Sequence, residues 1–139
     1  MALKNKTMKT LGIIKLLIMT LQPTPNRVET YAERIGILET EIVVSQSIAE
    51  CGWQYESYNA RERNNIFGYR GGRVTEDNPK RYSIYNHWTE SARAYKEWQD
   101  KVPIFGNYYE YLKQRGYSTN PEYCNYVEQV RKIWLRKRQ

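Results

Sequence analysis

The sequence is poor in the residues from which metal sites and histidine-based catalytic centres are built. It contains only two cysteines and one histidine in 139 residues. Cys51 and Cys124 belong to no Cys-x-x-Cys motif or Cys/His cluster, which argues against a structural zinc site. His87, in "YNHWTES", has no nucleophile motif near it, so we interpret it as a structural or capping residue. We therefore expect neither a metal nor another cofactor.

Long hydrophobic runs, internal repeats and low-complexity linkers are also missing. The N-terminal "MALKNKTMKTLGIIKLLIMTLQPTP" has some secretory-signal character, but Lys15 interrupts its apolar stretch and no small-x-small cleavage site precedes the prolines. The stretch is too short to span a membrane. We interpret it as an amphipathic helix over residues 8–20, followed by the break "QPTPN". Residues 1–24 are thus expected to be an N-terminal segment, and residues 25–139 one compact domain.

Acidic residues are outnumbered by basic ones, 15 against 22, which gives a net charge of +7. Such a charge favours anionic partners, namely nucleic acid, an acidic membrane surface or a cell-wall polymer that carries carboxylates. No helix-turn-helix or RNA-binding signature is present, so nucleic acid is not an expected partner. Five of the basic residues lie in the C-terminal "VRKIWLRKRQ". We interpret this tail as a solvated helix end, where positive charge is favourable against the helix dipole.

Aromatic residues are abundant, with 13 tyrosines and 4 tryptophans. These side chains combine a flat apolar body with a polar edge, which suits the stacked faces and hydrogen-bonded hydroxyls of a sugar ring. The alternative is that they form a small aromatic core. The candidates for a glycan groove, each with core or rim packing as its alternative, are Tyr82, Tyr85, Trp88, Tyr108 and Tyr109.

Periodicity and turn signals predict a mostly α fold, of α+β class, with one small β-hairpin. Asn26 is expected to cap the first helix of the domain, and Thr89 or Ser91 a later one. Glycines and Asn-Pro between residues 64 and 85 surround the short alternating run "RYSIY", which favours an irregular hairpin. The expected helices cover residues 26–36, 40–53, 88–101, 107–116 and 120–138.

The stretch "EIVVSQSIAECGWQYES", residues 41–57, places Glu50 among apolar residues with no lysine or arginine nearby. Helical periodicity makes this helix apolar on both sides, hence central, with Glu50 beside Gln46 and Trp53. Burial raises the pKa of a carboxyl group, so that it can hold a proton near neutrality and give it to a glycosidic oxygen. The alternative is a structural ion pair between Glu50 and a distant arginine.

The stretch "NNIFGYRGG" follows Glu50 at a short distance. Asn64 and Asn65 can satisfy loop backbone groups or bind sugar hydroxyls and acetamides. Phe67 is expected to anchor this loop in the core, and Gly68 permits a backbone conformation that other residues avoid. Binding sites commonly lie on such loops.

Four segments together resemble the glucosaminidase domain of glycoside hydrolase family 73, over residues 31–134. They are "SQSIAECGW", "NNIFGYR", "RYSIYNHWTESARAYKEW" and "YYEYLKQRGYSTNPEYCNYVEQVRKI". The family pattern reads A-Q-A-x-x-E-[ST]-G-W, then N-N-x-F-G, then a tyrosine and serine between hairpin and helix, then G-Y-x-T-D-P-x-Y. The segment "HWTESARAY" is similar to a compact version found in Bacteroidetes and phages. The resemblance implies a lysozyme-like helical domain whose β-hairpin lobe follows the central catalytic helix.

The resemblance also implies roles for particular residues. Glu50 matches the catalytic acid, and Tyr117 matches a late tyrosine that lies near this acid in the cleft. Cys51 stands where serine or threonine is usual, and Asn120 stands where aspartate is usual. The residues matched to substrate binding are Trp53, Asn64, Asn65, Phe67, Gly68 and Tyr85, and Ser91 matches the serine between hairpin and helix.

The implied activity is that of a peptidoglycan hydrolase, an endo-β-N-acetylglucosaminidase that cleaves the β-1,4 bond from N-acetylglucosamine to N-acetylmuramic acid. Family members often carry a second carboxylate on the hairpin, where the only acids here are Glu76 and Asp77. If either closes over the cleft, it can activate water for inversion. If neither reaches, the 2-acetamido group of the substrate takes part instead, with Tyr117 orienting it.

The expected partner is the glycan strand of the bacterial cell wall, and the chain is expected to act there as a monomer unless it is part of a virion. Autolysin, endolysin and bacteriophage roles all fit this resemblance. Two other functions remain open. One is the cleavage of a lytic transglycosylase or muramidase, and the other is that of a non-catalytic wall-binding or virion structural protein.

Overall fold

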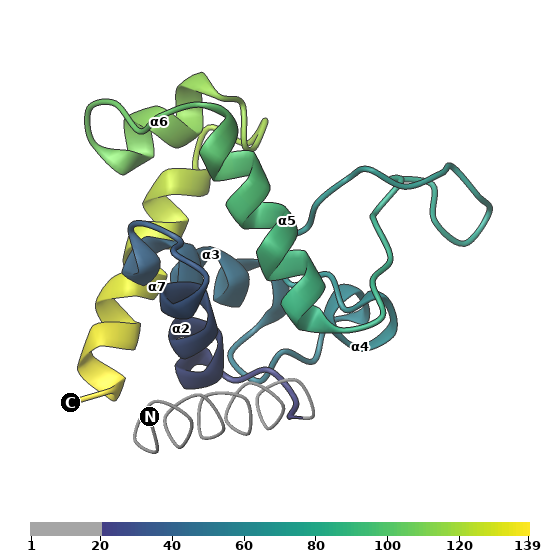
Figure 1. Ribbon diagram of the computed structural model, residues 1–139, viewed down its shortest axis with the longest axis horizontal. Coiled ribbons are helices and arrows are strands. Elements are labelled where there is room, and N and C mark those ends of the chain that lie inside the picture. Colours follow the sequence, from purple (N-terminus) through teal and green to yellow (C-terminus); the bar gives the residue numbers. More distant parts are fainter. Residues whose placement is uncertain (1–20) are drawn as a thin grey trace, which may run out of the picture.

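The computed structural model describes residues 21–139, so the helix expected at residues 8–20 lies outside the described residues. Figure 1 shows the helices of this part wrapped around α3, with a long arm extending to one side. Residues 21–139 contain no helix with the length and apolar character that a membrane span needs. In chain order the helices are α2 (Pro25–Arg34), α3 (Thr40–Cys51), α4 (Tyr58–Arg63), α5 (Trp88–Lys101), α6 (Tyr108–Gln114) and α7 (Tyr123–Lys137).

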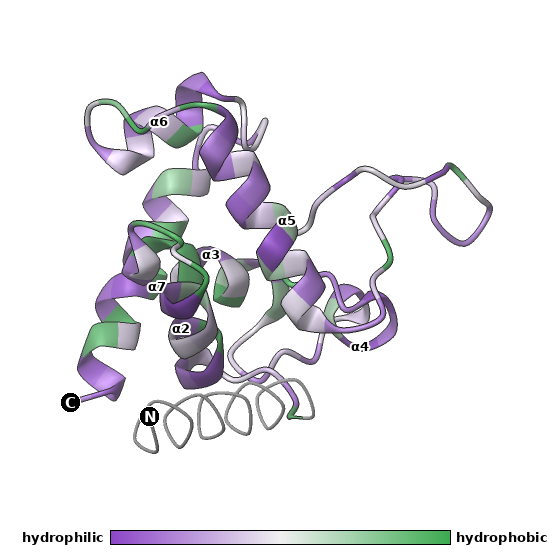
Figure 2. Ribbon diagram, in the orientation of Figure 1, coloured by the Kyte–Doolittle hydropathy of each residue, from purple (hydrophilic) through white to green (hydrophobic). Residues whose placement is uncertain are grey.

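The central helix is α3, which packs against α2, α4 and α7. Six consecutive residues from Val43 to Ile48 are buried, and Cys51 is 2% exposed. This burial on both sides confirms the central position predicted from its apolar pattern. Figure 2 shows apolar residues gathered where α2, α3 and α7 meet, while much of α5 is polar. The core thus holds α3 in place, and its C-terminal end faces the arm.

Two helix caps differ from the sequence prediction. Thr24, not Asn26, caps α2 by accepting a hydrogen bond from the backbone N–H of Arg27. Pro25 takes the first helical position, where a backbone N–H would have no partner within the helix, so the cap lies two residues earlier than expected. His87 caps α5, accepting a hydrogen bond at Nδ1 from the backbone of Thr89. His87 therefore has a structural role, as the cap at the start of α5.

The predicted β-hairpin is not formed as strands. Residues 68–85, here called the arm, do fold back on themselves, since the N–H of Gly72 donates to the carbonyl of Arg81 at 2.9 Å. Within residues 21–139, the single regular bridge is an antiparallel pair of Thr75 and Asn78. The described part of the chain is therefore almost entirely helical.

Side-chain amides explain why the arm has no ladder. The Asn65 amide, fully buried, accepts from the N–H of Tyr69 and donates to the carbonyls of Tyr69 and Ser83. Asn78 likewise accepts from the N–H of Tyr82 and donates to its carbonyl. Because these amides occupy backbone groups that a strand would pair, the arm is held in irregular turns.

A chain of buried polar groups crosses the core beneath the arm. Gln46, fully buried, donates to the hydroxyl of Tyr123 at 3.2 Å and accepts from the hydroxyl of Tyr95 at 2.5 Å. The Tyr95 hydroxyl lies 2.5 Å from that of Tyr108, which accepts from Gln99 at 3.0 Å. The buried polar side chains of this network thereby satisfy one another, and the network links α3, α5, α6 and α7.

The C-terminal basic residues are partly paired. Arg138 forms ion pairs with Glu29 of α2 at 2.6 Å and with Glu41 of α3 at 3.0 Å. Arg131 also reaches Glu41, at 3.1 Å. These partly exposed pairs add modest stability. They help to dock the end of α7 on α2 and α3, so this tail is not only a solvated helix end.

Candidate active site

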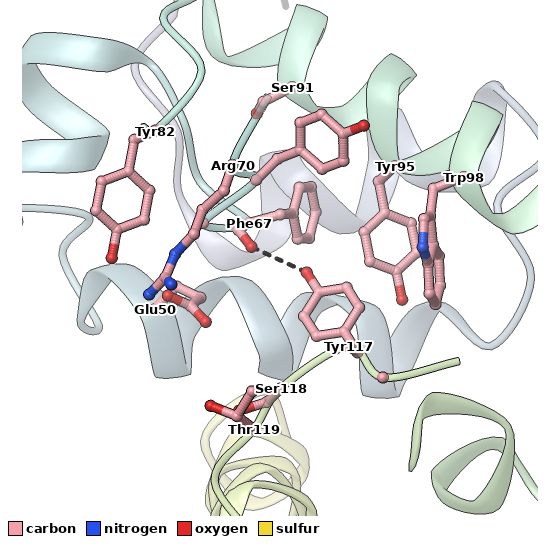
Figure 3. A pocket seen from close by; sticks show the side chains of 13 residues that line it. Glu50, Phe67, Arg70, Tyr82, Ser91, Tyr95, Trp98, Tyr117, Ser118 and Thr119 are labelled. Atoms are coloured by element: carbon pink, nitrogen blue, oxygen red, sulfur yellow. Dashed lines mark hydrogen bonds between the residues drawn. The ribbon is translucent and has the colours of Figure 1, made fainter. Parts of the chain in front are cut away.

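A cleft of about 350 Å³ opens at the C-terminal end of α3. The volume lies in the range of small-molecule sites. Figure 3 shows its side chains converging from α3, the arm, α5 and the loop after α6. The lining residues are Glu50, Phe67, Gly68, Tyr69, Arg70, Tyr82, Ser91, Tyr95, Trp98, Gly116, Tyr117, Ser118 and Thr119. The walls are thus mainly aromatic and hydroxyl-bearing, and a carboxyl group lies between them.

Glu50 lies in the last turn of α3 and is half-buried. Among residues 21–139, its carboxyl group forms neither a hydrogen bond nor an ion pair within the protein. The alternative of a structural pair with an arginine of this region is therefore not realised. Burial raises the pKa of Glu50, and the positive charge of Arg70 offsets part of that rise. The group thus holds its proton to higher pH than an ordinary glutamate does.

Gly68 explains how Glu50 is kept from water. A Cβ atom built on Gly68 would lie 2.7 Å from Oε2 of Glu50 and 2.9 Å from its Cδ. The backbone of the arm therefore rests directly against the carboxyl group. Gly68 also has φ of +70°, a conformation that side chains disfavour. The close contact and the positive φ both favour glycine at this position.

Tyr117 closes the cleft on the opposite side. Its hydroxyl donates to the backbone carbonyl of Phe67 at 2.9 Å, as Figure 3 shows. Its ring stacks on Tyr123 at 5.7 Å between centroids, and burial raises the pKa of Tyr117 well above its ordinary value. Tyr117 therefore stays protonated and joins the loop after α6 to the arm.

The comparison with known families agrees with this geometry. A family model described as mannosyl-glycoprotein endo-beta-N-acetylglucosaminidase matches residues 26–135. The chain belongs to the glucosaminidase family. This membership supports a glycoside hydrolase, and at the level of the family it supports peptidoglycan as the substrate. Searches of curated proteins and of solved structures found no match.

The structure brings four of the predicted site residues together at the cleft, namely Glu50, Phe67, Gly68 and Tyr117. Tyr82, a candidate for the glycan groove, and Ser91 also line it. Three other groove candidates lie elsewhere: Trp88 and Tyr108 are buried in the core, and Tyr109 donates its hydroxyl hydrogen bond to Glu128.

Asn64 and Asn65 lie behind the cleft wall. Asn64 donates its amide hydrogen bond to the carbonyl of Tyr85 at 3.0 Å, and Asn65 holds the backbone of the arm. Of the two roles left open for this pair, their contacts are those of loop-shaping residues. Tyr85 is half-buried and, like the two asparagines, is not among the lining residues.

Trp53 and the two acids of the arm also lie away from the cleft. Trp53 packs under Lys137, whose Nζ lies 4.4 Å from the ring centroid. Glu76 and Asp77 are exposed residues of the arm and are not among the residues that line the cleft. Among the described residues, Glu50 is thus the single carboxylate that lines the cleft. Nor do three or more metal-binding side chains gather anywhere in residues 21–139.

Sequence reasoning missed Arg70 and two residues of the aromatic wall, Tyr95 and Trp98. Ser91, Tyr95 and Trp98 have i, i+4, i+7 spacing, which places them on one face of α5. That spacing was a usable signal once Ser91 had been matched to the site. Arg70 follows Gly68 by two residues and had no comparable signal.

We expect Gly68→Ala to impair activity more than stability. The added methyl group would displace the Glu50 carboxyl group, so kcat should fall by about tenfold or more. The positive φ adds strain of about 1–2 kcal/mol. Kinetic measurement beside thermal unfolding separates the two effects.

Gly106→Ala is the matched control, because Gly106 also has positive φ, at +59°, but has open space around its Cβ position. It should lose similar stability and keep its activity. Wild-type kcat in the folded Gly68→Ala protein would show that the arm does not position Glu50.

Proposed function

We propose that this protein is an endo-β-N-acetylglucosaminidase that cleaves the β-1,4 bond from N-acetylglucosamine to N-acetylmuramic acid in peptidoglycan, with Glu50 as the general acid. The observation that carries the proposal is the half-buried carboxyl group of Glu50, free of protein partners in the described region, in a cleft walled by aromatic rings. The raised pKa of Glu50 favours the protonated form that a general acid needs.

In the proposed reaction the sugar chain lies across the mouth of the cleft, with the scissile oxygen at Glu50. Glu50 gives its proton to that oxygen as the bond to the anomeric carbon breaks, and positive charge develops on the sugar. Aromatic faces such as those of Tyr82 and Trp98 suit the ring faces of neighbouring sugars. Water then completes hydrolysis and leaves a reducing N-acetylglucosamine end.

The developing charge requires a second group, and the 2-acetamido group of the substrate fits best. Glu76 and Asp77 lie outside the cleft, whereas Tyr117 lines it. Since the Tyr117 hydroxyl donates its hydrogen bond to the backbone carbonyl of Phe67, its oxygen can still accept a hydrogen bond from the acetamide N–H. Such a bond would orient the acetamide oxygen for attack on the anomeric carbon.

We expect Tyr117→Phe to lower kcat by about 10- to 100-fold, because the acetamide would lose its acceptor. Loss of the bond to Phe67 should cost only about 1 kcal/mol of unfolding free energy. Tyr126→Phe, at a tyrosine 57% exposed on α7, is the control and should behave as wild type. An unchanged kcat in Tyr117→Phe would remove Tyr117 from the mechanism.

Digestion of purified peptidoglycan, followed by mass analysis of the fragments, tests the proposed bond. A glucosaminidase leaves reducing N-acetylglucosamine ends. Anhydro-muramic ends would instead identify a lytic transglycosylase, and reducing muramic acid ends a muramidase. Binding without any fragments would identify a non-catalytic wall protein.

A further inference from the structure

Arg70 is the one basic residue among those that line the cleft, and the proposed reaction gives it no role. Its side chain is exposed and lines the same cleft as Glu50. Figure 3 shows it reaching across the mouth between Tyr82 and Glu50. None of the five ion pairs within residues 21–139 includes Arg70. Its guanidinium therefore lies near Glu50, close enough for its charge to act on that carboxyl group, but forms no direct ion pair within the described chain.

The backbone on both sides of Arg70 is held by hydrogen bonds, and the side chain of Arg70 contacts Tyr82. Its guanidinium lies 5.3 Å from the centroid of the Tyr82 ring, a stacking contact that limits its motion. On one side, the backbone of Tyr69 is held by Asn65; on the other, the N–H of Gly71 donates to the hydroxyl of Ser83 at 2.9 Å. The arm thus presents a pre-organised cation, and an ordered cation loses less entropy on binding.

The charge of the cleft selects an anionic ligand. Glu50 is the one acidic residue and Arg70 the one basic residue that line the cleft. When Glu50 is protonated, as a general acid must be, the cleft carries one net positive charge. Guanidinium binds carboxylate through two parallel hydrogen bonds, a geometry that also orients the ligand.

We propose that Arg70 forms a carboxylate-binding subsite, so that the enzyme favours glycan strands with a free carboxylate near the cleaved bond over uncharged strands of N-acetylglucosamine. This inference rests on the proposed function and specifies its substrate class. The carboxylate has two sources in peptidoglycan, the lactyl group of muramic acid without its peptide and the acidic groups of the peptide stem. Both present the same chemistry to Arg70.

The test compares wild type with Arg70→Gln on four substrates, each at the pH optimum of the variant. The substrates are N-acetylglucosamine oligomers, strands stripped of peptide, strands with intact stems, and strands whose carboxylates have been converted to amides. On carboxylate-bearing strands, kcat/KM should fall by about tenfold or more, mainly through KM. On uncharged oligomers kcat/KM should fall by a much smaller factor than on carboxylate-bearing strands. The strand type that shows the fall identifies the source of the carboxylate.

Two further comparisons make the result specific. Amidation should lower kcat/KM of wild type as much as the substitution does and should not affect Arg70→Gln further. Arg73→Gln, at an exposed arm residue outside the cleft, is the matched control and should resemble wild type on every substrate. An equal fall on uncharged oligomers, or no fall on any strand, would overturn the proposal.

Binding separates this inference from the proposed function. Affinity for the same four substrates is measured in the Glu50→Gln background, with and without Arg70→Gln, so no turnover is needed. Weaker binding only to carboxylate-bearing strands supports the subsite even if wild type hydrolyses nothing. Equal affinity of Glu50→Gln and of the double variant with Arg70→Gln for every substrate contradicts the subsite, even if wild type is a glucosaminidase.

Discussion

Glu50→Gln should lower kcat on peptidoglycan by a factor of about 100 to 10,000, the largest effect we expect of any single change. Glutamine keeps the shape of the side chain but has no proton to give to the leaving oxygen. Glu50 is also the one carboxylate that lines the cleft among the described residues, so no neighbour there can take over its role. Release of soluble fragments from purified peptidoglycan measures the loss.

Glu56→Gln provides the matched control, because Glu56 is exposed shortly after α3 and lies outside the cleft. Its activity should equal that of wild type. Lysis by Glu50→Gln at the wild-type rate would mean that another group donates the proton.

The thermal stability of Glu50→Gln should not fall with its activity. Because the folded state raises the pKa of Glu50, it binds this proton more tightly than the unfolded state does. The resulting stabilisation is present below the unfolded pKa and is lost as pH rises through the folded pKa. Thermal unfolding of Glu50→Gln should therefore match wild type at acid pH and equal or exceed it at pH 8. A lower melting temperature at pH 8 would indicate a structural role for the carboxylate.

The second large effect is expected from Gln46→Leu, which should reduce the free energy of unfolding by about 2–5 kcal/mol. Gln46 is fully buried, donates to the hydroxyl of Tyr123 and accepts from that of Tyr95. Leucine would leave both hydroxyls without this partner in the core. Urea unfolding followed by circular dichroism measures the change.

Gln129→Leu is the control for this substitution, since Gln129 is exposed on α7 and the chemical change is the same. It should alter the free energy of unfolding by less than about 0.5 kcal/mol. Similar values for the two variants would show that the buried network does not hold the helices together. Because Tyr95 and Tyr123 flank Tyr117, we also expect Gln46→Leu to lose activity below its melting temperature.

Much of the helical architecture could be predicted, because periodicity and caps are local signals. The burial of α3 followed from apolar residues on both of its sides, and Gly116 and Asn107 marked the ends of α6 within a residue or two. The arm could not be predicted in the same way. Its path depends on buried asparagine amides that replace strand pairing, and alternating residues alone do not reveal such bonds.

The site was predictable where one helix or one motif sets a position. Helical projection placed Trp53 beside Glu50, but α3 ends at Cys51 and Gly52, at φ of +84°, turns the chain away. The contact between Tyr117 and Phe67 joins residues 50 positions apart, which periodicity cannot reveal. The resemblance supplied Tyr117, whereas neither source pointed to Arg70.

The central claim is that the arm shields the carboxyl group of the proton donor, Glu50, from water. Its most direct test is an NMR titration of the Glu50 carboxyl carbon, whose signal is assigned by its absence from Glu50→Gln. The account predicts that this carbon titrates above the ordinary range of glutamate, and higher still in Arg70→Gln, where the opposing positive charge is gone. A midpoint at or below the ordinary value in the wild-type protein would contradict it, because Glu50 would then be ionised at neutral pH and would have no proton to donate.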